Sequence, residues 1–373
     1  MLEAERYLRR QLEARKQENN FRQLRLLENK IDFTSNDYLG LARDPHFRQM
    51  VTAEITALHP QTGSTGSRLL SGNSAIAEDL EHQIAGFHKS ESALLFNSGF
   101  DANYGLLKTL PYRGDTVLFD ELCHASVHDG LRAGKASAIA FQHNDVMDLE
   151  EKLTSATGIK YVVTESLFSM DGDVAPLREL AAVCEKHGAA LIVDEAHATG
   201  VYGKSGEGLV QHLGLESRCF ARIHTFGKAM GSFGAVILGS ESLRQFLINY
   251  CRPFIFSTAL PPQLLLQIKC AYQYIPGLQA RREKIHSLAQ LLQSGVQNWK
   301  KGHLLPGLSP IQSLMIPGNA QAKQLAQTLQ QQGFDARAIL YPTVARGKER
   351  IRLCLHSFNT ESEIEQLITI LQA

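Results

Sequence analysis

The stretch LIVDEAHATG, Leu191–Gly200, decides the fold of this chain. Ala190–Asp194 has the composition of a buried strand, and the polar residues Asp194, Glu195 and His197 stand at its end. Parallel strands buried on both faces have continuous apolar runs. In open α/β sheets, ligands and catalytic groups gather beyond the carboxyl ends of the strands. The stretch therefore predicts a parallel strand that leads into a site, although an Asp after a strand is also a common turn residue.

Six further β-rich runs alternate with segments of helical periodicity along the chain. These runs are Ser92–Phe96, Asp115–Phe119, Ser137–Phe141, Tyr161–Glu165, Ala221–Thr225 and Ala235–Gly239. One intervening segment has Pro176 near its start and Gly188 past its end, which is the usual punctuation of a helix. The alternation predicts an α/β fold with a mostly parallel sheet between helices.

The two ends of the chain have a different pattern. Residues 1–20 have the periodicity of a helix, and from Pro261 onward long helical segments alternate with a few short apolar runs, as in a small α+β module. We therefore expect an N-terminal helix and strand segment over residues 1–40, a large domain over 41–260 and a small C-terminal domain over 261–373.

Composition narrows the function classes. The 373 residues include 38 basic and 38 acidic side chains, so charge gives no reason to expect nucleic acid or an acidic membrane as partner. The charged N-terminus has no signal-peptide pattern, and no apolar run approaches the roughly 18 residues that suggest a membrane span. Six scattered cysteines without a C-x-x-C pair indicate a reducing compartment. We expect a cytoplasmic protein.

Lys228 lies in an unusual setting. It stands in HTFGKAMGSFGA, between two apolar runs, with Gly227 and Gly231 close by and Thr225 three residues earlier. An isolated lysine is usually a solvated loop residue. A lysine that reacts with a carbonyl group needs an accessible amine and backbone that allows a ring to approach, and this segment is suited to both.

Two further segments follow predicted strands. Ser98–Asn103 comes after the first strand and begins a predicted helix, whose backbone amides suit a phosphate group. His124 follows the next strand, where its ring can stack on an aromatic ligand or serve as an ordinary loop histidine.

Other classes of function fit less well. His124 and His128 have a spacing that suits a metal on a helix, but the glutamate of the H-E-x-x-H motif is missing, and we expect no metal. The segment YGKSG resembles the end of a nucleotide-binding loop, but Ala198 occupies the place of its first glycine. A non-catalytic binding protein on the same fold is a further alternative.

Taken together, several segments resemble one family. They are SGF-AN, HAS, VDEAH-TG, T-GK-G and STALPP, joined by SNDYLGL, GSTGSRLLSG, FSMDGDVAPL and RIRLCLHSFNT. Together, from about Leu12 to the end of the chain, they resemble the α-oxoamine synthases, which are fold-type I pyridoxal-phosphate enzymes. The resemblance implies condensation of an amino acid with the acyl thioester of coenzyme A or a carrier protein, in a homodimer with shared active sites.

The resemblance also implies roles for individual residues. Lys228 would hold pyridoxal 5'-phosphate, Asp194 would pair with its ring nitrogen, His197 would contact its ring hydroxyl and His124 would stack on the ring. The phosphate would be bound by Ser98, Gly99, Phe100 and Thr225, and by Thr258 from the neighbouring subunit.

On the substrate side, Arg352 matches the arginine that holds the amino-acid carboxylate, which suits a guanidinium fork. Arg350 is a rival, because alternation along a strand points both side chains to the same face. Asn36 and Ser169 match positions that line the substrate side, where Ser169 would also contact the cofactor, and Arg22 matches an arginine that meets the acyl chain.

Overall fold

The computed structural model describes residues 2–24, 29–297 and 299–372. Contacts group the chain into two compact units. The first unit contains Met1–Ser35, Met170–Gly172 and Glu283–Ala373, and the second contains Asn36–Ser169 and Asp173–Arg282. The expected domain boundaries near residues 40 and 260 stay a prediction about how the chain is organised.

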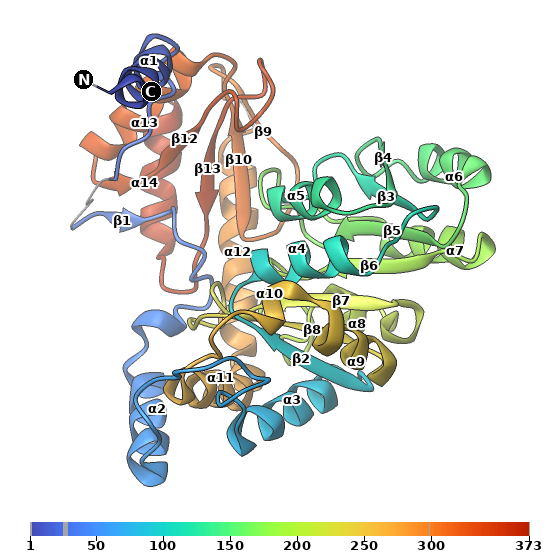
Figure 1. Cartoon of the computed structure of the whole chain (residues 1–373). Coiled ribbons are helices and arrows are strands. Elements are labelled where there is room, and N and C mark those ends of the chain that lie inside the picture. Colours follow the sequence, from blue (N-terminus) through green and yellow to red (C-terminus); the bar gives the residue numbers. More distant parts are fainter. Residues whose placement is uncertain (1, 25–28, 298, 373) are drawn as a thin grey trace. The chain divides into compact units, whose positions relative to one another are not determined.

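The second unit is built on a seven-stranded sheet (Figure 1). Its strand order is β2 (Ser92–Phe96), β8 (Ala235–Gly239), β7 (Ala221–Thr225), β6 (Ala190–Asp194), β5 (Lys160–Glu165), β3 (Thr116–Asp120) and β4 (Ser137–Phe141). Within this sheet β8 runs against both of its neighbours, and the other strands share one direction. The predicted α/β fold with a mostly parallel sheet is confirmed.

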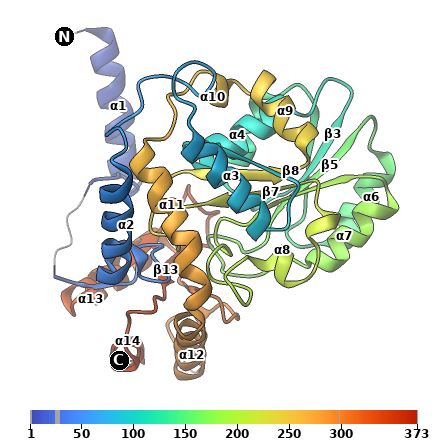
Figure 2. The same ribbon diagram turned by 90° about the horizontal axis from the view of Figure 1, so that it is seen from below.

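Helices cover both faces of this sheet, because the strands are apolar on both sides (Figures 1 and 2). One face packs against α4 (Gly99–Thr109), α5 (Ala125–Ala133), α9 (Glu241–Tyr250) and α10 (Arg252–Ile255), which share one hydrophobic cluster with the strands. Buried residues of α3 (Ala75–Phe87), α6 (Val146–Ser155) and α7 (Leu177–Lys186) lie outside that cluster and contact the strands. By alternation along the strands, these three helices cover the opposite face.

Further elements complete the second unit. They are η1 (Leu41–Arg43), α2 (Pro45–Leu58), α8 (Leu209–His212), η2 (Glu216–Arg218), α11 (Pro262–Tyr274) and η3 (Ile275–Gly277). The start of α2 follows directly from the sequence. Asp44 caps the helix by accepting the amides of His46 and Phe47, and Pro45 occupies the first helical position.

The first unit has an α+β composition. Its four-stranded antiparallel sheet has the order β12 (Arg337–Ile339), β13 (Arg350–Cys354), β10 (Ile311–Met315) and β9 (His303–Leu304), and β1 (Ile31–Asp32) pairs in parallel with β11 (Phe334–Asp335). Its helices are α1 (Glu3–Gln17), α13 (Asn319–Gln331) and α14 (Glu361–Gln372). Helix α12 (Gln279–Gly295) begins in the second unit and continues into the first.

The sheet direction decides where the site forms. Because β2 and β3–β7 run the same way, their carboxyl ends meet at one edge of the sheet. The loops that follow them carry the predicted cofactor residues of the second unit, from Ser98 after β2 to Lys228 after β7. Among the residues that the structure describes, no helix is long and apolar enough to cross a membrane.

Candidate active site

Lys228 lies in a tight turn between β7 and β8. The Phe226 amide donates to the carbonyl of Gly234 at 2.9 Å, the Ser232 amide donates to that of Phe226 at 2.8 Å, and Lys228 O accepts the Gly231 amide at 2.9 Å. Gly231 has φ of +60°, and a Cβ there would lie 2.7 Å from the Ala42 nitrogen. Because it has no side chain, Gly231 allows the turn to pack closely against the backbone of η1 at Ala42. At Gly227, which is exposed, a Cβ would meet only ordinary contacts, so Gly227 leaves the approach to the lysine open.

Asp194 ends β6 with its carboxylate buried to 5% exposure. Asn103 Nδ2 donates to Oδ2 at 2.6 Å, and the Ala196 amide donates to Oδ1 at 2.8 Å. Within the described part of the chain, no lysine or arginine forms an ion pair with this carboxylate. Buried carboxylates are stabilised by partners that supply positive charge, so Asp194 is suited to a cationic ligand atom.

His197 and Asn36 are joined through Tyr38. The Tyr38 hydroxyl lies 3.1 Å from Asn36 Oδ1 and 2.8 Å from His197 Nδ1, and Tyr38 is fully buried. The amide oxygen of Asn36 can only accept, so the single hydroxyl proton goes to it and His197 Nδ1 donates to the phenol oxygen. In the neutral ring, Nε2 is then the acceptor.

His124 caps α5, and the residue is exposed. Its Nδ1 lies 2.8 Å from Ser126 Oγ, and its amide donates to Glu165 Oε1 at 2.6 Å. Partial desolvation by the surrounding loops lowers the pKa of His124; the charge of Asp194 opposes this shift, and that of Lys228 adds to it. The loops after β3, β6 and β7 therefore bring these three predicted residues into one electrostatic environment.

The start of α4 lies against Thr225. Ser98 caps the helix by accepting the Asp101 amide at 3.0 Å, and a Cβ on Gly99 would lie 3.5 Å from the Thr225 side chain. Phe100 is 44% exposed and turns away from the core. Amides at the beginning of an eleven-residue helix, beside a threonine hydroxyl, form a cradle that suits a phosphate group.

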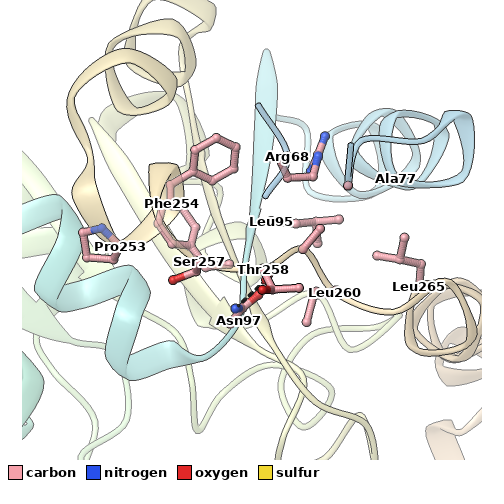
Figure 3. A pocket seen from close by; sticks show the side chains of 13 residues that line it. Arg68, Ala77, Leu95, Asn97, Pro253, Phe254, Ser257, Thr258, Leu260 and Leu265 are labelled. Atoms are coloured by element: carbon pink, nitrogen blue, oxygen red, sulfur yellow. Dashed lines mark hydrogen bonds between the residues drawn. The ribbon is translucent and has the colours of Figure 1, made fainter. Parts of the chain in front are cut away.

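Thr258 lies on the exposed segment after α10. It forms an isolated antiparallel bridge with Ser67, and its carbonyl accepts Asn97 Nδ2 at 2.9 Å (Figure 3). The cavity beside it, drawn in Figure 3, has a volume of about 20 Å³. That is room for about one water molecule, so this cavity is too small for a cofactor.

Three predicted substrate residues belong to different settings. Arg22 Nη2 donates to Thr343 Oγ1 at 3.0 Å, within the first unit. Ser169 is half-buried in the loop after β5. Ser169 and Asn36 both belong to the second unit. Arg352 is half-buried on β13 of the first unit.

Arg350 differs clearly from Arg352. It is 5% exposed and forms an ion pair with Asp171, also in the first unit. A buried guanidinium that is already paired with a carboxylate has a structural task. This contact favours Arg352 over Arg350 as the arginine that meets a substrate carboxylate.

The residues of the second unit fit pyridoxal phosphate. They combine an amine on an open turn, a buried carboxylate without an ion-pair partner and a helix start beside a hydroxyl group. Each group matches one part of the cofactor, namely its carbonyl, its ring nitrogen and its phosphate. In the described residues, no group of three His, Cys, Asp or Glu side chains could hold a metal ion.

Sequence reasoning missed three neighbours of these residues, namely Tyr38, Asn103 and Glu165. Tyr38 and Asn103 lie inside two of the segments that resemble the family, SNDYLGL and SGF-AN. Their place in these segments could have identified them as residues near the site. Glu165 ends a predicted strand beside the one that ends at Asp194. Its position at the same sheet edge could have identified it.

Comparison with known proteins identifies the family. The family model of the class I and II aminotransferases matches residues 28–371. The chain therefore belongs to this family and has the fold of the fold-type I pyridoxal-phosphate-dependent transferases.

Individual relatives narrow the class. The chain is 41% identical to 8-amino-7-oxononanoate synthase of Emericella nidulans, covering 97% of this chain and 93% of the relative. A serine palmitoyltransferase of S. paucimobilis, solved with PLP and myriocin, is similar with a TM-score of 0.90 and 27% identity, over 98% of this chain and 96% of that one. The 8-amino-7-oxononanoate synthase of Francisella tularensis is similar with a TM-score of 0.80 and 27% identity, over 92% and 97%.

Proposed function

We propose that this protein is an 8-amino-7-oxononanoate synthase of biotin biosynthesis. It condenses L-alanine with a pimeloyl thioester of coenzyme A or a carrier protein, and it releases carbon dioxide and the free thiol. The relative from Emericella nidulans, which bears this name and aligns over nearly the whole chain, is the observation that carries the proposal. The lysine, carboxylate and helix start at the sheet edge support the cofactor that such chemistry requires.

Pyridoxal phosphate supplies an electron sink for the carbanion that forms at Cα of the amino acid. The chain supplies the groups around it. Lys228 Nζ would hold the cofactor and would accept the proton from Cα of the amino acid. Asp194 would keep a proton on the ring nitrogen, His197 would contact the ring hydroxyl, and the His124 imidazole would lie against the ring.

Glu165 completes this electrostatic setting. Burial raises the pKa of Glu165 to about 8, and the nearby charge of Asp194 adds to this shift. At neutral pH Glu165 therefore carries a proton, so Asp194 supplies the negative charge for the ring nitrogen. The lowered pKa of His124 keeps its ring neutral, which suits stacking beside a protonated pyridine.

The phosphate is bound by Ser98, Gly99 and Phe100 at the start of α4 and by Thr225. Ser169 contacts the cofactor from the loop after β5. Thr258 serves the phosphate of the other subunit in a homodimer, and its exposed position on the second unit is suited to that task.

Arg352 and Asn36 bind the amino acid, and Arg22 meets the acyl donor. Arg22 and Thr343 line a cavity of about 520 Å³ in the first unit. The charged residues of its lining are the cations Arg22, Lys323 and Arg337. A cavity lined this way favours an anionic group, such as the terminal carboxylate of a pimeloyl chain.

The first test is the visible absorption spectrum of the purified protein with pyridoxal phosphate, during separate titrations of L-alanine, glycine and L-serine. We expect a band from the bound cofactor that shifts with L-alanine. The Lys228→Ala variant should lose the band of the covalently held cofactor. Lys204→Ala, which changes an exposed lysine in another loop of the second unit, is the matched control.

The second test is product analysis by mass spectrometry, with L-alanine and pimeloyl-CoA as substrates. Formation of 8-amino-7-oxononanoate, dependent on Lys228, is the expected result. A protein that binds no pyridoxal phosphate would contradict the whole proposal. Binding without this product would contradict the substrate assignment alone.

A sister activity deserves the same assay, because the similar structure with the TM-score of 0.90 is a serine palmitoyltransferase. A spectral shift with L-serine and condensation with a long-chain acyl-CoA would favour that activity. The positively charged lining of the Arg22 cavity argues for a donor with an anionic end instead.

A further inference from the structure

His143 connects three loops at the carboxyl edge of the sheet. It lies two residues after the end of β4, and its Nδ1 is 2.9 Å from Asp120 Oδ1 at the end of β3. On the other side of the ring, Nε2 is 2.7 Å from Asp173 Oδ2, in the loop after β5. All three residues belong to the second unit.

This geometry requires a protonated ring. A neutral imidazole has one N–H group, whereas an imidazolium has two and can donate to a carboxylate on each side. Burial works to lower the pKa of His143, but the hydrogen bonds and charges of Asp120 and Asp173 outweigh it and raise this pKa to about 9. The ring is therefore a cation at neutral pH.

Asp120 links His143 to the turn that precedes His124. Its carboxylate is fully buried and also accepts the Leu122 amide at 2.9 Å and the Asn144 amide at 2.8 Å. The Leu122 bond shapes the turn that leads from β3 to His124, at the start of α5. The carboxylate that holds the imidazolium thus also fixes the backbone of a predicted cofactor residue.

Asp173 links His143 to the loop that contains Ser169. Its carbonyl accepts the Phe168 amide at 3.0 Å, and Leu167 and Val174 form an antiparallel bridge at the base of the same loop. The Phe168 ring meets the His143 ring edge-on, with centroids 4.5 Å apart at 89°. Ser169 follows directly, so its position depends on the segment that His143 holds.

The cluster has an excess of negative charge. Besides the two aspartates, Glu121 is a third carboxylate of the cluster, and its Oε1 accepts the backbone N–H of His143 at 3.3 Å. The side-chain Nδ2 of Asn144, which is uncharged, donates to Asp173 Oδ2 at 2.7 Å. Asp173 Oδ1 is buried without a partner among the described residues. Without the cation, Asp120 and Asp173 would repel each other and the loops would separate.

We propose that His143 is a positioning residue for the active site: by bridging Asp120 and Asp173, it holds the Ser169 loop against the turn that carries His124. It thereby sets the affinity for the phosphorylated cofactor. This inference rests on the proposed function for the roles of Ser169 and His124, while the bridge itself can be tested without cofactor.

The experiment compares wild type with His143→Gln, in which a neutral side chain of similar size replaces the cation. His187→Gln is the matched control. His187 is also half-buried and lies 3.4 Å from a carboxylate oxygen, that of Glu150, but it follows α7 at the opposite edge of the sheet. Amide hydrogen exchange of Phe168 and Ala175 is measured in cofactor-free protein, because both amides bond within the loop. The dissociation constant of pyridoxal phosphate is then measured for each protein.

We expect faster exchange at these two amides and an increase of about tenfold in the dissociation constant for His143→Gln, equivalent to about 1.4 kcal/mol. Neither should change in His187→Gln. Above about pH 9, cofactor affinity of the wild type should fall relative to that of His143→Gln, because the imidazolium loses its proton. Unchanged exchange and unchanged affinity, or the same changes in His187→Gln, would overturn the proposal.

Failure of the proposed function has a different signature. If the wild type binds no cofactor, the proposed function is wrong, and the exchange data alone then decide whether His143 holds the loop. If His143→Gln does not fold, Asp173→Asn replaces it, since this variant keeps the bond between His143 and Asp120. The same direction of change is expected there, and wild-type behaviour of Asp173→Asn would overturn the bridge.

Discussion

Tyr38→Phe tests how the chain orients His197. The change removes one buried hydroxyl group and leaves the aromatic ring, so it creates almost no cavity. The hydroxyl makes hydrogen bonds of 3.1 Å to Asn36 and 2.8 Å to His197. At about 1 kcal/mol for each bond, we expect the free energy of unfolding to fall by about 2 kcal/mol.

The same variant should change the proton on His197. In the wild type the bond to Tyr38 keeps a proton on Nδ1, so the neutral ring presents Nε2 as an acceptor. Without the hydroxyl this preference is lost. Nitrogen NMR of the cofactor-free protein with labelled histidine measures the tautomer directly, and denaturant unfolding measures the stability.

Tyr161→Phe is the control for the loss of a tyrosine hydroxyl as such. Tyr161 is 5% exposed, and its hydroxyl forms no hydrogen bond with any residue that the structure describes. This variant should keep the wild-type tautomer of His197 and lose less than about 0.5 kcal/mol. A Tyr38→Phe variant with an unchanged tautomer would refute the assignment of Nδ1 as the donor. A stability loss equal to that of the control would refute the energetic argument.

Three further changes have definite expected outcomes. Asn103→Leu removes an amide donor from Asp194, and it should weaken pyridoxal phosphate binding by about tenfold or more in a fluorescence titration; unaltered binding would count against the role of Asp194. Glu81→Ala leaves Arg68 half-buried without its bidentate partner, and denaturant unfolding should show a loss of about 3 kcal/mol. Burial raises the pKa of Asp32, but amide hydrogen bonds from its turn outweigh this and lower it to about 2. The resulting stability is present above pH 3.8 and is lost as the pH falls toward 2; Asp32→Asn should remove about 1 kcal/mol of it, after allowance for solvent screening.

The sheet could be predicted almost completely from the sequence. Five of the seven predicted strands have the observed bounds, and the other two differ by one residue, because strands that are apolar on both faces contrast sharply with the helices between them. The strand order could not be read from periodicity. It depends on which strands pair across distant parts of the chain, as β2 does with β8.

The chemistry of the site was only partly accessible. Motifs located Lys228 and Asp194, since short segments of sequence carry them. The hydrogen bonds that prepare these residues come from elsewhere in the chain, as with Asn103, which lies 91 positions from Asp194. Spacing alone left Arg350 and Arg352 equivalent on one face of β13, whereas the ion pair of Arg350 with Asp171 distinguishes them.

The acidic residues at the sheet edge show why one of them is suited to the cofactor. Asp120 and Asp173 share the single positive charge of the His143 ring, which lies between them. The pKa of Glu165 is raised to about 8 by burial and by its neighbour Asp194, so Glu165 is uncharged at neutral pH. Asp194 is held instead by an amide side chain and a backbone N–H, which orient its carboxylate without cancelling its charge. The chain thus pairs Asp120 and Asp173 with a cation, keeps Glu165 protonated and leaves the negative charge of Asp194 at the position that faces the ring nitrogen in the proposed mechanism.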